Sequence, residues 1–185
     1  AFVTVQGFDF FGCEPTTGDE ATSDVVLDDI DARYMNHNVR HDIWVFQGYG
    51  SAQQTGTKLL GPRNVIRNSR LAYASSMGVW IGAQGRVENN LIHDIGYDSN
   101  WSAPVNLWGE DQSNDIVITK NTMYRVSRSC VDLGYSFVEG QVKHALNLEI
   151  SFNDMSRFLM LNQDGGAIYA WGYRDTTGTV IHHNW

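Results

Sequence analysis

Carboxylates are the residues of this sequence best suited to chemistry. Asp164 precedes two glycines, Asp132 stands inside an apolar run, and Glu110 follows a Trp-Gly pair. Two carboxyls on either side of a glycosidic bond can hydrolyse it, one as acid and the other as base or nucleophile. We therefore predict Asp164 and Asp132 as the catalytic pair, with Glu110 as an alternative to Asp132. A turn residue in an Asp-Gly step is the other interpretation of Asp164.

Aromatic and polar residues recur near these carboxylates, at matching places in apolar runs. Exposed rings beside Asp and Asn are unusual on a plain solvent face. Flat rings can stack on sugars while polar groups bind hydroxyls, and this mixture is typical of a small-molecule site. The alternative is that loops cover the rings and bury them as a secondary core. The predicted substrate-binding residues are Trp80, Asn106, Trp108, Tyr169, Trp171 and Arg174.

A repeated apolar run that ends in asparagine must position these side chains. The last four of its asparagines are separated by 31, 32 and 31 residues. Periods of roughly 20 to 50 residues are typical of solenoids and arrays. The clearest copies span residues 65–68, 87–90, 117–121, 148–153 and 180–184, and weaker copies span 3–7 and 26–29.

Each repeat holds three short strand-like runs, the third ending in glycine. No apolar period of 3.6 residues is sustained, so long helices are not expected. The pattern predicts an all-β, right-handed parallel β-helix of about seven coils with uncapped ends. Inward residues would stack into one core, with coils about 4.8 Å apart. Asparagine tolerates left-handed φ, so we expect it to line up between neighbouring coils.

The sequence resembles the right-handed parallel β-helix, or pectate-lyase-like, family. The resemblance rests on Asp164-x-Gly-Ala-Ile-Tyr, then Arg174-Asp175 and Gly178-Thr-Val-Ile-x-x-Asn184. It is strong over residues 64–185 and weak before them. The pattern is similar to that of bacterial β-helix proteins that include glycoside hydrolases of xylose- or fucose-type glycans. The resemblance implies the fold and a carbohydrate partner, although the fold carries many activities.

A glycoside hydrolase acting on a neutral poly- or oligosaccharide is the function that these features favour. A non-catalytic glycan-binding or structural module, such as an adhesin, fibre or spike segment, is the first alternative. A polysaccharide lyase is the second. Lyases commonly use a basic residue to remove a proton, and we expect no Lys or Arg in the outward columns of the third strands.

Composition limits the partners and the domain organisation. The 185 residues suit one domain, with irregular coils and loops over 1–63 and regular coils over 64–185. The net charge of −8 disfavours nucleic acid, which needs a basic footprint. No long apolar run predicts a membrane span. We expect a secreted or cell-surface protein and a fragment of a longer chain, with end-to-end stacking or a homo-oligomer as the alternative.

No cofactor is expected. Ca²⁺ could bind at the carboxylates of Asp28, Asp29 and Asp31, but turn capping is the favoured interpretation. His93 beside Asp94 could act in acid–base chemistry, and packing in a turn is again favoured. The expected register places the two cysteines, Cys13 and Cys130, four coils apart, so both are predicted to be free thiols.

Overall fold

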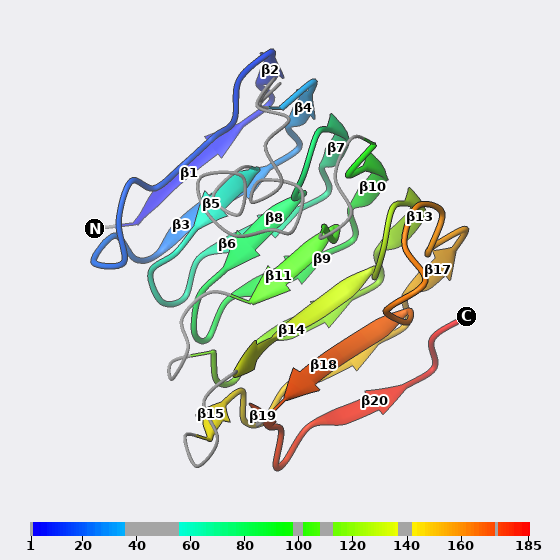
Figure 1. The fold of residues 1–185 in the computed structure, drawn as a ribbon. Coiled ribbons are helices and arrows are strands. Elements are labelled where there is room, and N and C mark those ends of the chain that lie inside the picture. Colours follow the sequence, from blue (N-terminus) through cyan, green and yellow to red (C-terminus); the bar gives the residue numbers. More distant parts are fainter. Residues whose placement is uncertain (1, 36–55, 98–101, 108–112, 137–141, 173) are drawn as a thin grey trace.

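The computed structural model describes residues 2–35, 56–97, 102–107, 113–136, 142–172 and 174–185. Within these ranges the chain forms strands and turns and no helix. Three parallel sheets run side by side along the molecule, with the N-terminal strands at one end and the C-terminal strands at the other (Figure 1). The prediction of an all-β architecture with parallel sheets is therefore confirmed.

The three sheets, here called A, B and C, are each built from strands that come from successive repeats. Sheet A contains β1 (Val3–Gln6), β3 (Val25–Asp28), β6 (Val65–Arg67), β9 (Arg86–Glu88), β12 (Val117–Thr119), β16 (Glu149–Ser151) and β20 (Val180–His182). Sheet B contains β2 (Asp9–Phe11), β4 (Asp31–Arg33), β7 (Arg70–Ala74), β10 (Leu91–Ile95), β13 (Thr122–Val126) and β17 (Asp154–Ser156). Sheet C contains β5 (Thr57–Leu59), β8 (Val79–Ile81), β11 (Val105–Leu107), β14 (Val131–Ser136) and β18 (Ile168–Gly172), and a separate pair joins β15 (Lys143–His144) to β19 (Arg174–Asp175).

The chain visits the sheets in a fixed order from β6 to β14. Each pass contributes one strand to sheet A, one to sheet B and one to sheet C, and each strand pairs in parallel with the strand of the next pass. This order explains the period of about 31 residues, because one period is one complete pass. The arrangement is compatible with a β-helix-like solenoid.

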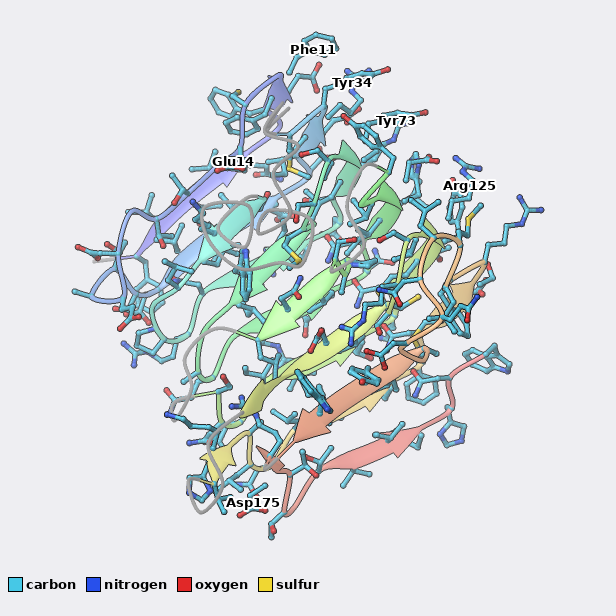
Figure 2. All side chains as sticks on the ribbon, viewed as in Figure 1. Phe11, Glu14, Tyr34, Tyr73, Arg125 and Asp175 are labelled. Atoms are coloured by element: carbon cyan, nitrogen blue, oxygen red, sulfur yellow. The ribbon has the colours of Figure 1, made fainter. Side chains whose placement is uncertain are left out.

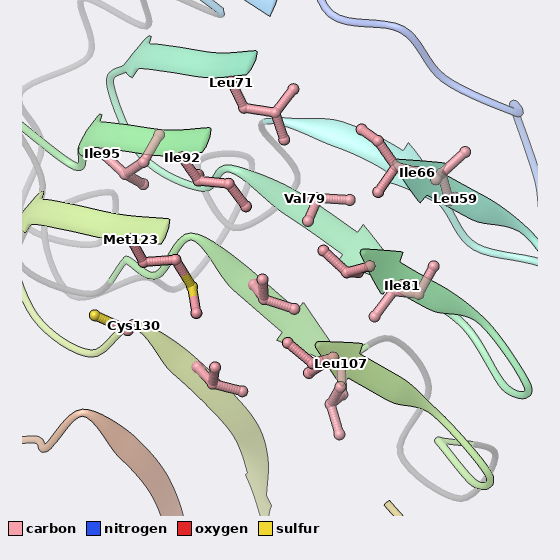
Figure 3. Packing of buried hydrophobic residues seen from close by; sticks show 14 of the residues in the cluster. Leu59, Ile66, Leu71, Val79, Ile81, Ile92, Ile95, Leu107, Met123 and Cys130 are labelled. Carbon is pink, nitrogen blue, oxygen red and sulfur yellow. The ribbon is translucent and has the colours of Figure 1, made fainter. Parts of the chain in front are cut away.

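Buried aliphatic residues fill the space between the sheets. Ile66, Val87, Ile118 and Ile150 lie in register on sheet A and are fully buried. Figure 3 shows Leu71, Ile92 and Met123 of sheet B pointing into the same interior as Ile66 of sheet A and Val79 and Ile81 of sheet C. Fully burying one such side chain contributes roughly 1.5 to 3 kcal/mol, so the stacked core is the main source of stability. The predicted inward residues Val105, Leu107, Val131 and Leu133 are likewise buried.

Asparagines line up at the turn between sheets A and B, as predicted. The backbone N–H of Asn90 donates to Asn121 Oδ1 at 3.0 Å, that of Asn121 to Asn153 Oδ1 at 2.9 Å, and that of Asn153 to Asn184 Oδ1 at 3.0 Å. Each side-chain amide of Asn90, Asn121 and Asn153 also donates to a strand carbonyl of the preceding repeat. Since buried polar groups need partners, the ladder stabilises the turn without water.

One member of this ladder was assigned wrongly. Ser69, not Asn68, occupies the ladder position, because its backbone N–H donates to Asn90 Oδ1 at 3.0 Å. Asn68 lies one residue earlier with φ of 52° and accepts a hydrogen bond from Asn89. Adjacent polar residues made the two positions indistinguishable in the sequence.

The region before residue 64 also differs from the prediction. The Gly-, Gln- and Thr-rich composition of residues 48–61 predicts a loop, yet β5 (Thr57–Leu59) is a strand of sheet C. Thr57 and Leu59 are fully buried, and Lys58 between them is only partly buried, which is the alternation of a strand. This alternation covers only three residues inside a longer polar segment, so the sequence alone does not reveal it. The alternation of inward Ile43 and Val45 with outward Trp44 predicts another third strand, and these residues lie outside the described part of the chain.

Two smaller expectations concern cysteines and membranes. Cys13 is exposed, Cys130 is buried, and both are free thiols, as predicted. None of the described segments is a helix with the length and apolar character needed to cross a bilayer.

Candidate functional site

The outward positions of sheet C form one column across neighbouring strands. The register pairs Lys58 with Trp80, Trp80 with Asn106, Asn106 with Asp132, and Asp132 with Tyr169. The alternation that predicted this column is thus correct from Trp80 onward. The expectation of no basic residue in it is wrong, because Lys58 stands at its end.

Asn106 differs from the other column residues because it is buried. Its side chain is only 3% exposed, and Nδ2 donates to the carbonyl of Ala103 at 2.9 Å. Trp80 next to it is partly buried. The column is therefore not evenly exposed along its length. The accessible carboxyl of this region is that of Asp164, which lies near Asp132.

Arg128 brings the two leading carboxylates together. Its Nη1 donates to Asp132 Oδ2 at 2.9 Å and its Nη2 to Asp164 Oδ2 at 3.4 Å. Since both contacts end on one planar guanidinium, the two carboxylate oxygens are at most about 9 Å apart. Glycosidases hold their two carboxyls roughly 5 to 9.5 Å apart. This upper bound is compatible with that range of carboxyl separations.

Tyr169 completes the cluster. Its hydroxyl donates to Asp164 Oδ1 at 2.8 Å, and the Arg128 Cζ lies 4.3 Å from its ring centroid. A guanidinium at this distance from an aromatic ring is stabilised by a cation–π interaction. Asp164 therefore accepts from both neighbours, while its side chain stays 53% exposed.

Asp132 is more buried than Asp164, and this burial changes its pKa. The side chain of Asp132 is 19% exposed, and burial raises the pKa of this carboxyl. A hydrogen bond from the Gly134 N–H, and the charges of Arg128 and Arg174, act in the opposite direction on that pKa but are the smaller effects. Burial also raises the pKa of Tyr169, with its hydrogen bond to Asp164 as the second cause. Asp132 consequently retains its proton to higher pH than an ordinary aspartate does.

The turn before β18 holds Asp164 against the preceding repeat. The N–H of Leu159 donates to the Arg128 carbonyl at 2.8 Å, and the N–H of Cys130 donates to the Ala167 carbonyl at 3.0 Å. A Cβ on Gly165 would lie 2.9 Å from Ser129 Oγ and 3.1 Å from Arg128 Cγ. The Gly-Gly pair thus allows the turn to approach Arg128 more closely than a larger residue would permit.

Trp171 and Arg174 lie at the far end of this strand pair. The register shifts after Asp132, so that Tyr135, rather than the expected Gly134, pairs with Trp171. Gly134 has φ of +81°, which is the irregularity that displaces the pairing. Trp171 is 36% exposed, and a Cβ on Gly134 would lie 3.6 Å from Arg174 Cζ. Arg174 is therefore near Asp132, whose pKa its charge lowers in part, and Trp171 lies two residues after Tyr169 on β18. Trp108 and Glu110 lie outside the described residues.

Arg128 is the central residue that sequence reasoning missed. It stands three residues before Val131, where the paired strands have Ser76 before Val79 and Ser102 before Val105. A charge at a position otherwise held by serine is the signal that could have identified it. Its residue exposure is only 2%, which for an arginine requires partners.

His93 and Asp94 form a second polar cluster, on sheet B. Arg70 Nε donates to His93 Nε2 at 3.1 Å, so Nδ1 carries the proton toward Asp94 Oδ2 at 2.5 Å. Arg125 donates to both Asp94 oxygens, at 2.6 and 2.5 Å. The Arg125 hydrogen bonds are the main cause that lowers the pKa of Asp94. These contacts agree with the packing role that was favoured for His93 and Asp94.

Aromatic rings continue this sheet B edge. Tyr34 and Tyr73 stack with centroids 4.9 Å apart, and His93 stacks with Tyr124 at 5.0 Å. Figure 2 shows Phe11, Tyr34, Tyr73 and Arg125 following one edge of the molecule. The ring faces contact one another, so the row is a packing feature rather than a platform for sugars.

A Ca²⁺ site is the less favoured interpretation of the carboxylates of Asp28, Asp29 and Asp31. Asp28 instead accepts hydrogen bonds from Arg67 at 2.9 Å and from Asn68 at 2.8 Å, and the Arg67 bond is the main cause that lowers the pKa of Asp28. In the ranges that the structure covers, no group of three or more His, Cys, Asp or Glu residues is arranged to hold a metal ion. A polar pocket of about 510 Å³ does lie at the sheet A–sheet B corner, beside Asp29 and Asp31, away from the sheet C cluster.

Comparison of this chain with protein-family models, curated proteins and solved structures finds no match. The argument for function therefore rests on the geometry of the sheet C cluster. That cluster offers a partly buried carboxyl, an exposed carboxyl and an arginine that contacts both.

Proposed function

We propose that this chain is a carbohydrate-active enzyme, a glycoside hydrolase of neutral poly- or oligosaccharides, on a right-handed parallel β-helix of about seven coils. The observation that carries the proposal is the contact of Arg128 with both Asp132 and Asp164. Hydrolysis of a glycosidic bond needs two such carboxyls in different protonation states. The cluster holds two carboxyls, one partly buried with a raised pKa and one about half exposed.

Asp132 is the general acid in this proposal. Burial raises its pKa, so the proton that the leaving-group oxygen requires is retained to higher pH than in an ordinary aspartate. Asp164 is the base or the nucleophile. It is half exposed and accepts hydrogen bonds from Tyr169 and Arg128, so one side of the carboxyl is held in place while the other stays open to a ligand.

The neighbours of the pair bind the sugar. Tyr169, Trp171 and Trp80 supply rings along sheet C, and Arg174 supplies a donor beside Asp132. Asn106, which is buried, supports the strand between Trp80 and Asp132. Trp108 and Glu110 remain members of the proposed site from the sequence.

The test is hydrolysis of a panel of aryl glycosides and neutral oligosaccharides by the wild-type chain and by Asp164→Asn and Asp132→Asn. Each substitution removes one half of the pair at nearly constant shape. We expect both variants to lose activity about 10² to 10⁴-fold. Asp154→Asn is the matched control, because this exposed aspartate lies on β17 of sheet B. Full activity of Asp164→Asn on a substrate that the wild type cleaves would remove Asp164 from the mechanism.

A lyase is the second candidate, and the basic residues of this region favour it. Lys58 stands in the sheet C column, and Arg174 lies beside Asp132. A lyase acting on uronate-containing glycans would form an unsaturated product that absorbs in the ultraviolet. Such a product would replace the hydrolase proposal, whereas glycan binding without any cleavage would favour a non-catalytic module.

A further inference from the structure

Arg128 is held at three separate points of its guanidinium group. Nε donates to the Asp164 carbonyl oxygen at 2.7 Å, Nη1 to Asp132 Oδ2 at 2.9 Å, and Nη2 to Asp164 Oδ2 at 3.4 Å. Its fourth neighbour is the Tyr169 ring, 4.3 Å from Cζ to the centroid. The side chain is 3% exposed, so these contacts lie almost entirely out of water.

We propose that Arg128 is the positioning residue of the carboxylate pair: its guanidinium sets the separation of Asp132 and Asp164 and fixes the turn that carries Asp164. The proposal rests on the proposed function for its consequence in catalysis, and on geometry alone for its consequence in structure. Arg128 does not need to touch substrate in this role, because it acts through the two aspartates.

The hydrogen bond from Arg128 to the backbone carbonyl of Asp164 distinguishes a positioning role from simple charge neutralisation. A residue that only neutralised Asp164 would need to contact its carboxylate alone, whereas the shortest Arg128 contact is with the Asp164 carbonyl. That contact holds the main chain of the turn, and the Nη1 contact holds β14 through Asp132. The two elements come from successive repeats, and Arg128 joins them.

The side of the turn that faces Arg128 is shaped for this contact. Leu159 donates its N–H to the Arg128 carbonyl at 2.8 Å, and Leu161 donates to Ser127 at 3.0 Å. Gly165 allows the close approach, since a Cβ there would press on Arg128 Cγ. The segment over residues 159–167 is thus docked on the Arg128 turn along both its main chain and its side chain.

Arginine is required here rather than any cation. A planar guanidinium presents donors in fixed directions, and a lysine ammonium is a single point on a flexible stem. Arg128→Lys would keep the charge but lose the simultaneous contacts with two carboxylates and a carbonyl. Arg128→Gln would lose the charge as well.

The experiment compares Arg128→Gln and Arg128→Lys with Arg125→Gln, which removes an arginine that also pairs with an aspartate but lies on sheet B. On the substrate that the wild type cleaves, we expect Arg128→Gln to lower kcat about 10²-fold, as misplacement by about 1 Å does. KM should change by less than about threefold, because the lost interaction matters in the transition state. Arg128→Lys should still lose about tenfold, and Arg125→Gln should retain the wild-type kcat.

Amide hydrogen exchange supplies a readout that needs no substrate. We expect residues 159–167 to exchange about tenfold faster in Arg128→Gln, since the turn loses its anchor, and at the wild-type rate in Arg125→Gln. If circular dichroism shows that Arg128→Gln does not fold, the same kinetic and hydrogen-exchange measurements on Arg128→Lys test the proposal.

The possible failures are distinguishable. Wild-type kcat and wild-type exchange in the Arg128 variants, with Asp132→Asn and Asp164→Asn inactive, would overturn the positioning role and leave the hydrolase intact. If the wild type cleaves no glycan, the proposed function fails, and the exchange rates alone decide whether Arg128 fixes the turn. Unchanged exchange in that case would overturn the inference.

Discussion

Two arginines three residues apart in sequence, Arg125 and Arg128, each pair with aspartate, yet their surroundings have opposite effects on that aspartate. Arg125 is on sheet B with a side chain 38% exposed, and its hydrogen bonds are the main cause that lowers the pKa of Asp94. Arg128 is 3% exposed, and beside it burial prevails and raises the pKa of Asp132. An ion pair alone therefore does not reveal a role, because the balance between hydrogen bonds to the carboxyl and its desolvation sets the direction of the pKa shift.

The number of hydrogen-bond partners of each aspartate also distinguishes the sheet B cluster from the sheet C cluster. Asp94 receives both Arg125 bonds and a His93 bond, which leaves its oxygens occupied. Arg128 divides its donors between Asp132 and Asp164, and Asp164 remains half exposed. The sheet B cluster is arranged for packing, whereas the sheet C cluster leaves a carboxylate accessible to a ligand.

The largest expected difference between the regions is in activity. Asp132→Asn should lower kcat about 10² to 10⁴-fold, because it removes the proton donor. Asp94→Asn should leave kcat within about threefold while lowering the free energy of unfolding by about 1 to 3 kcal/mol, since Arg125 loses a charged partner. Steady-state kinetics and urea denaturation of both variants check this. Equal loss of activity in the two variants would erase the distinction.

The asparagine ladder supports both regions, so weakening it should affect both. Asn121→Ala removes donation to Val87 O and to Asn153 Oδ1, and acceptance from Asn90. We expect the free energy of unfolding, measured by urea denaturation, to fall by about 1 to 3 kcal/mol, because the partner groups become unsatisfied. The neighbouring control Thr122→Ala should stay within about 0.5 kcal/mol of the wild type. A stability loss in Asn121→Ala no greater than in the control would show that the ladder is dispensable.

The pH dependence of stability should have opposite signs at the two aspartates. Asp94 has a lowered folded pKa, so its contribution is present above the unfolded value of about 3.9 and is lost as pH falls through the folded pKa. Asp132 has a raised folded pKa, so stability is greatest below that unfolded value and falls as pH rises through the folded pKa.

Urea midpoints measured between about pH 3 and pH 7 test these signs. Asp94→Asn should flatten the loss of stability on the acid side, and Asp132→Asn should flatten the decline at higher pH. The reverse assignment would contradict the comparison of the two regions.

Thiol labelling gives the smallest and most local test. Cys130 is buried beside Arg128, and burial raises the pKa of its thiol to about 12, so it should react only when the segment opens. We expect Arg128→Gln to speed labelling of Cys130 severalfold and Arg125→Gln to leave it unchanged, with exposed Cys13 as the internal reference. Equal labelling rates in both variants would show that Arg128 does not hold the segment closed.

Much of the architecture was predictable because each repeat must satisfy the same packing and turn requirements. The spacing of Asn90, Asn121, Asn153 and Asn184 identified the ladder, and the alternation around Val79 and Val131 identified the inward residues. The exchange of Asn68 for Ser69 arose because either residue can occupy a polar turn position. β5 was missed because three residues carry too little alternation to stand out from a loop.

The residues of the candidate site could be predicted from the sequence only where the repeat pattern or a short motif marks them. Asp132 and Tyr169 lie in register and could be placed by alternation, and Asp164 lies in a recognisable Asp-Gly-Gly segment. Arg128 lies in a turn between sheets, where no periodic pattern constrains the side-chain direction. The burial of Asn106 and the register shift at Gly134 depend on contacts between repeats, which a single run of sequence does not encode.

A carbon-13 NMR titration of the aspartate carboxyls tests most directly whether Asp132 is the acid of a working pair. The Asp132 signal should titrate at a higher pH than an ordinary aspartate and above Asp94 in the same sample, since burial prevails at Asp132 and the Arg125 bonds prevail at Asp94. An Asp132 signal that titrates at or below that of Asp94 would contradict the assignment of Asp132 as the proton donor.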